Sequence, residues 1–278
     1  MKTYLAAAAS ATGALLALCL AHAGPQVATD GVSSDEPPVS DLPWGISSGG
    51  ADVAREVQPF FITGLVANPH GPPFTDESLR SLRGAFGIKS LDLRRTEITD
   101  AGMEIVKGIS GLHTLDISGT AVTDGGLRHL REVSSLQELH LGRGITDAGI
   151  VHLRKLRWLE RLTFDIKTKL TDEGIVALEG LTRLSSLALR SPLITDAGMK
   201  SVAKLSGLTE LDLSMTQVTD AGLDELVGLK SLRTLSVYDT AVTDAGIERF
   251  QEALPDCRVS KAILQQAGYE TAHTSIRQ

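Results

Sequence analysis

The sequence predicts an α/β fold: a curved, right-handed solenoid with a parallel β-sheet on its concave face and short helices on its convex face. Three observations lead to this prediction. From residue 88 the chain repeats itself with a period of about 24 residues. Each period holds a short alternation of apolar residues and then apolar residues three apart. Aromatic residues make up 4% of the chain although 42% is hydrophobic, so aliphatic side chains must fill the core.

The first 23 residues have the pattern of a secretory signal peptide. Lys2 precedes an apolar run over residues 4–20, and Ala-His-Ala at 21–23 follows as a small-residue cleavage site. A transmembrane anchor is one alternative, but the run is shorter than the ~20 residues that a span requires. A lipoprotein signal acylated at Cys19 is another, although Leu18 stands where such signals have a small residue. We expect a secreted, periplasmic or extracellular protein with no membrane span after cleavage.

The residues that flank the repeats are assigned by composition. Residues 24–59 hold five of the ten prolines and little apolar periodicity, so we expect a disordered linker. Residues 60–87 are predicted to form an N-terminal cap and a half-row, and residues 262–278 a C-terminal tail. After signal cleavage Cys257 is the one cysteine left, which excludes an intramolecular disulfide. We expect this thiol to be a buried apolar filler.

Residues 88–261 form the repeat domain, with seven rows and a terminal strand. In row 2 the alternation at Leu115 and Ile117 predicts a short strand with both side chains inward. The spacing of Leu127 and Leu130 then predicts a short helix. Neither element can bury its apolar face alone, so the rows must stack strand on strand and helix on helix. The rows begin at Ile88, Leu112, Leu136, Leu159, Leu184, Leu208 and Leu232.

A Thr-Asp pair is the most regular element of the rows. A line of carboxylates could bind Ca²⁺, but stacking spreads these carboxylates instead of converging them on one ion. Each pair falls where a helix is predicted to begin, so its hydroxyl or carboxylate can cap free backbone N–H groups, at about 1 kcal/mol per cap. We therefore predict a capping role. The pairs stand at 75/76, 99/100, 123/124, 146/147, 171/172, 195/196, 219/220 and 243/244.

These rows resemble leucine-rich-repeat proteins, specifically the cysteine-containing type found in F-box substrate receptors and in secreted bacterial relatives. The resemblance covers residues 74–261 and implies a protein-binding function. Threonine replaces the Cys or Asn that this type usually has after the strand, which suggests that hydroxyls now satisfy the loop backbone. No F-box-like segment precedes the rows, so a ligase-adaptor role is disfavoured. The replaced positions are Thr96, Thr120, Thr216 and Thr240.

The concave face is the candidate binding surface, because its outward strand positions are polar and of mixed charge. Rows 3 and 4 are one residue shorter and one longer than the period, which brings Arg143, Lys167, Lys169 and Arg190 to adjacent loops as a basic edge. His140 near Asp116 and Asp165 is the one arrangement that resembles an acid–base site. The predicted binding residues are Asp92, Arg94, Asp116, Glu138, His140, Arg143, Arg161, Asp165, Lys167, Lys169, Arg190, Asp212 and Tyr238.

The sequence favours a non-enzymatic protein-binding module. It holds no nucleophile motif, P-loop or dinucleotide turn. His129 and His152 share a helix position in successive rows, but no third metal ligand accompanies them. A net charge of −7 disfavours a nucleic-acid partner. We expect a monomer that binds a protein, with no cofactor or metal. The alternatives are an inhibitor of an extracellular enzyme, an envelope or adhesion component, and a ubiquitin-ligase adaptor.

Overall fold

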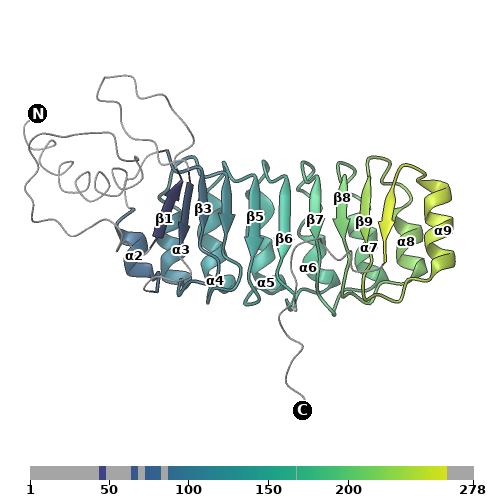
Figure 1. Ribbon diagram of the computed structural model, residues 1–278, viewed down its shortest axis with the longest axis horizontal. Coiled ribbons are helices and arrows are strands. Elements are labelled where there is room, and N and C mark those ends of the chain that lie inside the picture. Colours follow the sequence, from purple (N-terminus) through teal and green to yellow (C-terminus); the bar gives the residue numbers. More distant parts are fainter. Residues whose placement is uncertain (1–43, 48–63, 68–72, 83–86, 167, 262–278) are drawn as a thin grey trace, which may run out of the picture.

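The fold is an α/β solenoid built on one open ten-stranded sheet whose strands follow chain order (Figure 1). The computed structural model describes residues 44–47, 64–67, 73–82, 87–166 and 168–261. The predicted signal peptide, the predicted C-terminal tail and Lys167 lie outside these residues. Within them, no helix is long and apolar enough to cross a membrane. A row of strands lies in front of a row of helices, as predicted.

Eight parallel strands carry the rows, and a hairpin precedes them. The hairpin strands, β1 (Trp44–Ser47) and β2 (Gly64–Ala67), pair antiparallel, and β2 pairs parallel with β3. The parallel strands are β3 (Ser90–Asp92), β4 (Thr114–Asp116), β5 (Glu138–Leu141), β6 (Arg161–Phe164), β7 (Ser186–Ala188), β8 (Glu210–Asp212), β9 (Thr234–Ser236) and β10 (Arg258–Ser260).

Strand β1 lies within residues 24–59, for which the sequence predicts a disordered linker. Four residues are too few to display an apolar period, and the pairing of β1 with β2 is made by backbone groups. Composition therefore could not reveal this strand.

Each row returns through a helix that begins at its Thr-Asp pair. The α-helices are α2 (Asp76–Arg80), α3 (Asp100–Val106), α4 (Asp124–Leu127), α5 (Asp147–Ile150), α6 (Asp172–Val176), α7 (Asp196–Val202), α8 (Asp220–Leu226) and α9 (Asp244–Ala253). In rows 2 and 3 the α-helix continues as a 3₁₀ helix, η2 (Arg128–Glu132) and η3 (Val151–Lys155).

The core is a stack of aliphatic side chains in strict register. Leu91 of β3 lies beside Leu115 of β4, which lies beside Leu139 of β5, and the series continues to Leu235 of β9. These leucines are at most 2% exposed and belong to one continuous core. Burial of each such side chain stabilises the fold by about 2 kcal/mol, so packing across rows holds the array together.

The threonine of the Thr-Asp pair is the helix cap that the sequence predicted. In α3, Thr99 Oγ1 accepts a hydrogen bond from the backbone N–H of Ala101 at 3.2 Å. The same bond to the second helical residue recurs in α4 to α8, while Thr243 of α9 accepts from Gly246. The extended backbone of each threonine is typical of an N-cap residue.

The aspartate does something different: it joins its row to the next one. Asp147 Oδ1 accepts from the backbone N–H of Thr171 at 2.9 Å, and Oδ2 accepts from its hydroxyl at 2.6 Å. Carboxylates at positions 76, 100, 124, 172, 196 and 220 make the same two bonds to the threonine of the following row. We call this series the Asp–Thr ladder. Of the two groups that the sequence offered as helix caps, the hydroxyl therefore caps the helix and the carboxylate bonds to the next row.

The ladder explains why a glycine stands three residues after each ladder threonine. A Cβ on Gly174 would lie 2.2 Å from Asp147 Oδ1 and 2.4 Å from Leu170 Cδ1, which is too close for any side chain. The same clash with the preceding aspartate occurs at the matching glycine of each complete row. In the half-row the matching residue is Ser78, and no ladder aspartate precedes it among the described residues.

The loops after the strands divide the rows into regular and irregular ones. In rows 1, 2, 6 and 7 a threonine hydroxyl donates to the carbonyl of the residue just after the strand, as Thr216 does to Leu213 at 2.6 Å, which confirms the predicted role. Arg95, Gly119, Met215 and Asp239 have left-handed backbone at one equivalent position of these rows. In row 5, Ser191 instead donates to the carbonyls of Thr168 and Leu170.

Cys257 is buried at 2% exposure, as expected, just before strand β10. Burial raises the pKa of its thiol to about 11. We expect it to resist iodoacetamide at pH 8, where the thiolate is scarce, and to react at the ordinary cysteine rate in urea. A Cys19→Ser variant leaves it as the sole thiol. Mass spectrometry measures the extent of labelling. Equal labelling of the native and the unfolded chain would contradict the buried position of Cys257.

Candidate binding surface

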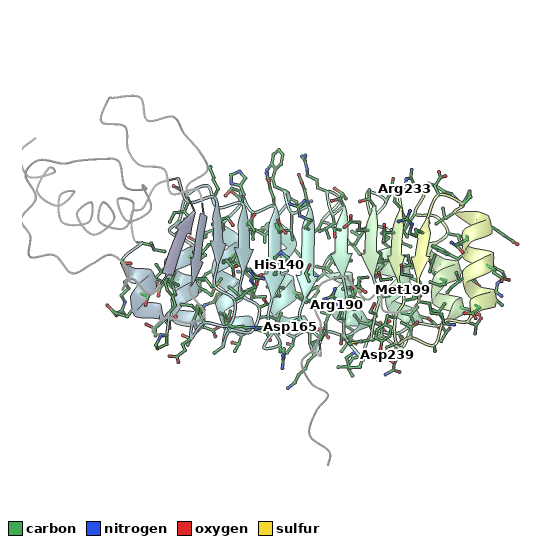
Figure 2. The ribbon with its side chains drawn as sticks, viewed as in Figure 1. His140, Asp165, Arg190, Met199, Arg233 and Asp239 are labelled. Carbon is green, nitrogen blue, oxygen red and sulfur yellow. The ribbon has the colours of Figure 1, made fainter. Side chains whose placement is uncertain are left out.

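The strand face is the side of the sheet that the helices leave uncovered, and it carries most of the predicted binding residues. Their side chains come from alternate positions of β3 to β8, because neighbouring residues point into the core. Figure 2 shows His140 over the middle of the sheet, with Asp165 and Arg190 toward the edge where the strands end. We call this edge the carboxyl edge and the opposite one the amino edge.

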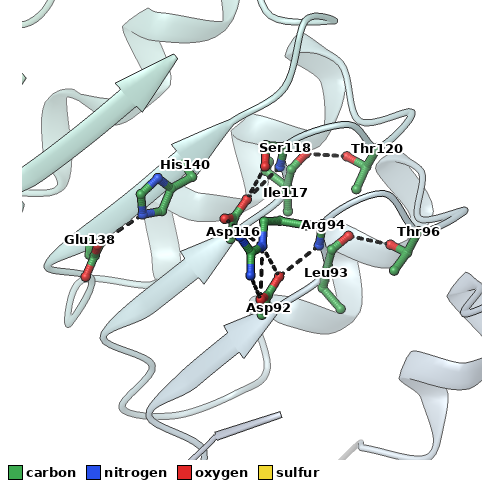
Figure 3. Close-up of polar contacts among 10 residues, drawn as sticks. All are labelled: Asp92, Leu93, Arg94, Thr96, Asp116, Ile117, Ser118, Thr120, Glu138 and His140. Carbon is green, nitrogen blue, oxygen red and sulfur yellow. Dashed lines mark hydrogen bonds and ion pairs between the residues drawn. The ribbon is translucent and has the colours of Figure 1, made fainter. Parts of the chain in front are cut away.

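Asp92, Arg94 and Asp116 form a cluster at the N-terminal end of this face (Figure 3). Arg94 Nε donates to Asp92 Oδ1 at 2.9 Å and its Nη2 to Oδ2 at 2.7 Å, while Asp116 Oδ2 lies 3.4 Å from Nε. The hydrogen bond to Asp92 raises the pKa of Arg94. Asp116 is further held by the backbone N–H and hydroxyl of Ser118. The cluster is thus bonded internally across two strands.

Glu138, Arg161 and His140 form a second cluster at the centre of the face. Arg161 Nη2 donates to Glu138 Oε2 at 3.0 Å, and His140 Nε2 lies 3.0 Å from Oε1. The hydrogen bond from Arg161 lowers the pKa of Glu138 although burial opposes it. His140 lies opposite Asp116 in strand register, as expected, but its bond is to Glu138 instead of to Asp116 or Asp165.

The Glu138 pair predicts a dependence of stability on pH. Because the pKa of Glu138 is lowered by folding, its contribution is present above the ordinary carboxyl pKa and is lost as pH falls through the lowered value. We expect Glu138→Gln to be less stable than wild type at pH 7, with the difference closing as the pH falls below the ordinary carboxyl pKa and through the lowered pKa of Glu138. Urea denaturation at several pH values measures this. A gap that stays constant with pH would mean that charge plays no part.

The expected basic edge is largely neutralised by partners. Arg143 Nε lies 3.3 Å from Asp165 Oδ2, and Arg190 lies 2.7 Å from Asp212 Oδ2. Each pair joins neighbouring rows, so Asp165 and Asp212 belong to the same surface as the arginines. Lys169 is exposed on the carboxyl edge. Lys167, the fourth expected member, lies outside the described residues.

Tyr238 is half-buried and lies in row 7, whereas Glu138 and Arg161 lie in rows 3 and 4. The structure therefore does not bring Tyr238 together with the central cluster. Between these two regions, Ala188 of β7 and Ser236 of β9 flank Asp212 in strand register. The predicted residues thus form pairs spread along the sheet instead of one convergent pocket.

No group of three or more His, Cys, Asp or Glu side chains converges on a possible metal position within the described part of the chain. Arg128 Nε lies 3.2 Å from His129 Nε2, which places a cation where a metal would have to bind. Burial lowers the pKa of His152, whose Nδ1 is buried without a hydrogen-bond partner. The carboxylate oxygens of the Asp–Thr ladder already accept hydrogen bonds from threonines of the following row.

The family model described as "Leucine Rich repeat" matches residues 88–104 and 206–227, in row 1 and across rows 5 and 6. Together with the stacked strand–helix rows, this match supports a leucine-rich-repeat fold. The fold of the chain is that of a leucine-rich-repeat solenoid. Solved leucine-rich-repeat structures share its fold. No curated protein sequence matches it significantly.

Two solved structures illustrate the likeness of this leucine-rich-repeat fold. An internalin C2 of Listeria monocytogenes is 24% identical, with a TM-score of 0.57 over 72% of this chain and 81% of that chain. A leucine-rich-repeat protein of Leptospira interrogans is 21% identical, with a TM-score of 0.52 over 72% of this chain and 48% of that chain. At these identities the likeness concerns the fold alone.

Trp158 and Arg183 are surface residues that the sequence reasoning did not select. The Arg183 guanidinium lies 4.2 Å from the centroid of the Trp158 ring, and the tryptophan is 51% exposed. Both stand at the position just before the first leucine of a repeat. Aligning the repeats shows Gly, Ser or Asp at this position in the others, so a tryptophan there was a detectable signal.

Proposed function

We propose that this leucine-rich-repeat protein is an exported, non-enzymatic interaction module that holds a protein partner on its strand face. One observation supports this most directly: the face carries a series of arginine–carboxylate pairs, most of which bridge neighbouring strands. Wide solenoid faces of this kind are the usual binding surfaces of repeat proteins. Arginine is also enriched among the residues that dominate binding energy at interfaces.

The pairs favour selective binding over indiscriminate adhesion. Four guanidinium groups on the face already contact a carboxylate, those of Arg94, Arg143, Arg161 and Arg190. A partner must therefore match these charges to compensate for their desolvation. The side chains of the pairs are held in place by bonds across rows, which reduces the entropy lost on binding. Lys167 and Lys169 are proposed as additional contacts of the partner.

Export and subtype are also proposals. Export rests on the charged start, apolar run and small-residue site of residues 1–23. The cysteine-containing repeat type rests on the position of Thr96 and its equivalents, whose hydroxyls bond the loop carbonyls. We propose a monomer whose partner is a protein and not a nucleic acid, in keeping with the net charge of −7.

Site-specific photo-crosslinking in the producing cells tests the proposed surface. A benzophenone residue replaces Thr163 at the centre of the strand face or, as the control, Asp224 on the helix side. We expect a covalent adduct with one protein from position 163 that is absent from position 224. Equal adducts from both positions, or none from position 163, would contradict binding on the strand face.

The identified partner then allows an affinity measurement. We expect Arg161→Glu and Arg190→Glu each to weaken binding about tenfold or more, because each breaks one bridging pair and repels its former carboxylate. Arg128→Glu, on the helix side, is the matched control. Melting temperatures verify that each variant is folded. Unchanged affinity in both strand-face variants would refute the proposal.

A further inference from the structure

The exposed apolar side chains gather in the middle of the array. Among the described residues, the large hydrophobic side chains that are exposed are Val151, Trp158, Val176 and Leu193, all in rows 3 to 5. Val151 and Val176 occupy one equivalent helix position, where the other rows have charged residues. At this helix position the middle rows therefore present apolar side chains to solvent where the other rows present charged ones.

Trp158 is the largest of these side chains and it is held in place. It lies in the turn between η3 and β6, on the amino edge of the sheet, where Arg183 of the next row packs against its ring. Figure 2 shows this edge at Arg233, opposite Asp239 on the carboxyl edge. The arginine orders the ring, and half of the tryptophan surface stays exposed. An ordered, exposed indole loses little entropy when a partner covers it.

Four cationic residues lie either within four residues of Trp158 in the sequence or at the equivalent position of the next row. Arg154, Lys155, Arg157 and Arg183 are all exposed, and none forms a salt bridge within the described part of the chain. Arg157 Nη1 instead donates to the carbonyl of Gly180 at 3.4 Å.

Nearby carboxylates do not neutralise these cations. Glu179, the acid on the neighbouring helical row, is held by Lys204 and by the hydroxyl of Ser201. Glu160, the acid nearest to Trp158 in the sequence, and Glu132, at the end of η2, form no salt bridge among the described residues. Arginines on the strand face differ sharply, because Arg94, Arg143, Arg161 and Arg190 each contact a carboxylate.

We propose that Arg154, Lys155, Arg157, Trp158 and Arg183, the Trp158 edge, form a second docking surface that binds an acidic segment of a protein partner. The unpaired cations supply charge complementarity to carboxylates, and the indole supplies an apolar anchor. Tryptophan and arginine are the residue types most enriched at interface hot spots. A long polyanion is disfavoured because the rest of this acidic chain repels it, whereas a short segment meets only the local positive field.

The fluorescence of Trp158 provides a direct test on the full chain. Trp44→Phe leaves Trp158 as the sole tryptophan. The probe is a synthetic peptide of glutamate, aspartate and leucine, compared with a peptide in which lysine replaces each acid, and with heparin and single-stranded DNA. We expect a saturable change in Trp158 emission with the acidic peptide alone. Its affinity should fall about tenfold as salt rises from ~0.05 to ~0.5 M.

Charge reversal separates this surface from the strand face. We expect Arg157→Glu with Arg183→Glu to weaken peptide binding about tenfold or more. Arg233→Glu, in the equivalent turn region of row 7, and Arg190→Glu, on the strand face, should leave it unchanged. Equal binding to the double variant, no saturable binding to wild type, or tighter binding of heparin or DNA would each overturn the proposal. None of these outcomes bears on the strand-face partner, which is tested by other variants.

Discussion

Asp147→Ala is expected to lower the free energy of unfolding by about 2 kcal/mol, more than the loss of an ordinary helix cap. The carboxylate accepts both the N–H and the hydroxyl of Thr171, so its removal leaves two donors of the next row without their partner. Both groups are half-buried, which limits the help that water can give. The rows in a solenoid depend on their neighbours, so weakening one junction affects the whole array.

The matched control is Asp244→Ala, measured with the first variant by urea denaturation. Asp244 also begins a helix, so it shares the interaction of a carboxylate with the positive helix end. It is 86% exposed and bonds to Lys261 instead of to a threonine of a following row. We expect its loss to change stability by no more than about 0.5 kcal/mol. Equal losses in the two variants would show that the Asp–Thr ladder contributes nothing beyond the helix-end charge.

Gly174→Ala is expected to destabilise the protein by about 2 to 3 kcal/mol, although alanine is the better helix former. The added methyl would overlap Asp147 Oδ1 and the side chain of Leu170, both of which are fixed by packing and by the ladder. Gly180→Ala is the control in the same repeat, because nothing lies within 4 Å of its ideal Cβ. Thermal and urea unfolding measure the stability of both variants. An unchanged stability of Gly174→Ala would contradict the clash.

A double substitution tests the cause of that clash. The three atoms nearest to an added Cβ at Gly246 all belong to Asp220. We expect Asp220→Ala with Gly246→Ala to lose less stability than the sum of the two single losses, because removing the carboxylate opens the space. Additive losses in a double-mutant cycle would place the strain elsewhere. This comparison separates steric conflict from the intrinsic helix preference of alanine.

Sequence periodicity was sufficient for the strands, the helices and the threonine caps. These depend on local rules: alternate burial along a strand, apolar spacing along a helix, and a hydroxyl at the first helical turn. Asp147 shows where local rules end. From the sequence, its carboxylate was expected at the start of its own helix, and a bond to the next row was not predicted. Once the rows stack in register, Thr171 presents two donors to it, and the reach across rows prevails.

The predicted binding residues show the same limit. Alternation placed Glu138, His140 and Arg161 on one face, because successive side chains in a strand point to opposite sides. Which of them bond could not be read from alternation, since His140 lies opposite Asp116 yet bonds Glu138. The expected basic edge shows the same limit. Arg143 and Arg190 add positive charge in the sequence, but in the folded protein each is paired with an aspartate of the neighbouring row.

The sequence by itself determined the repeated strand–helix row, its stacking and its apolar core, because a periodic pattern can be buried only by repeating the same contacts. The tertiary structure decided which charged side chains form ion pairs or hydrogen bonds with other residues and which do not. Seven of the eight Thr-Asp carboxylates are bound across rows by the Asp–Thr ladder. Arg94, Arg143, Arg161 and Arg190 are paired, and the cations beside Trp158 are without a carboxylate partner among the described residues. Charge pairing depends on distances between rows, and these exist only after the chain has folded.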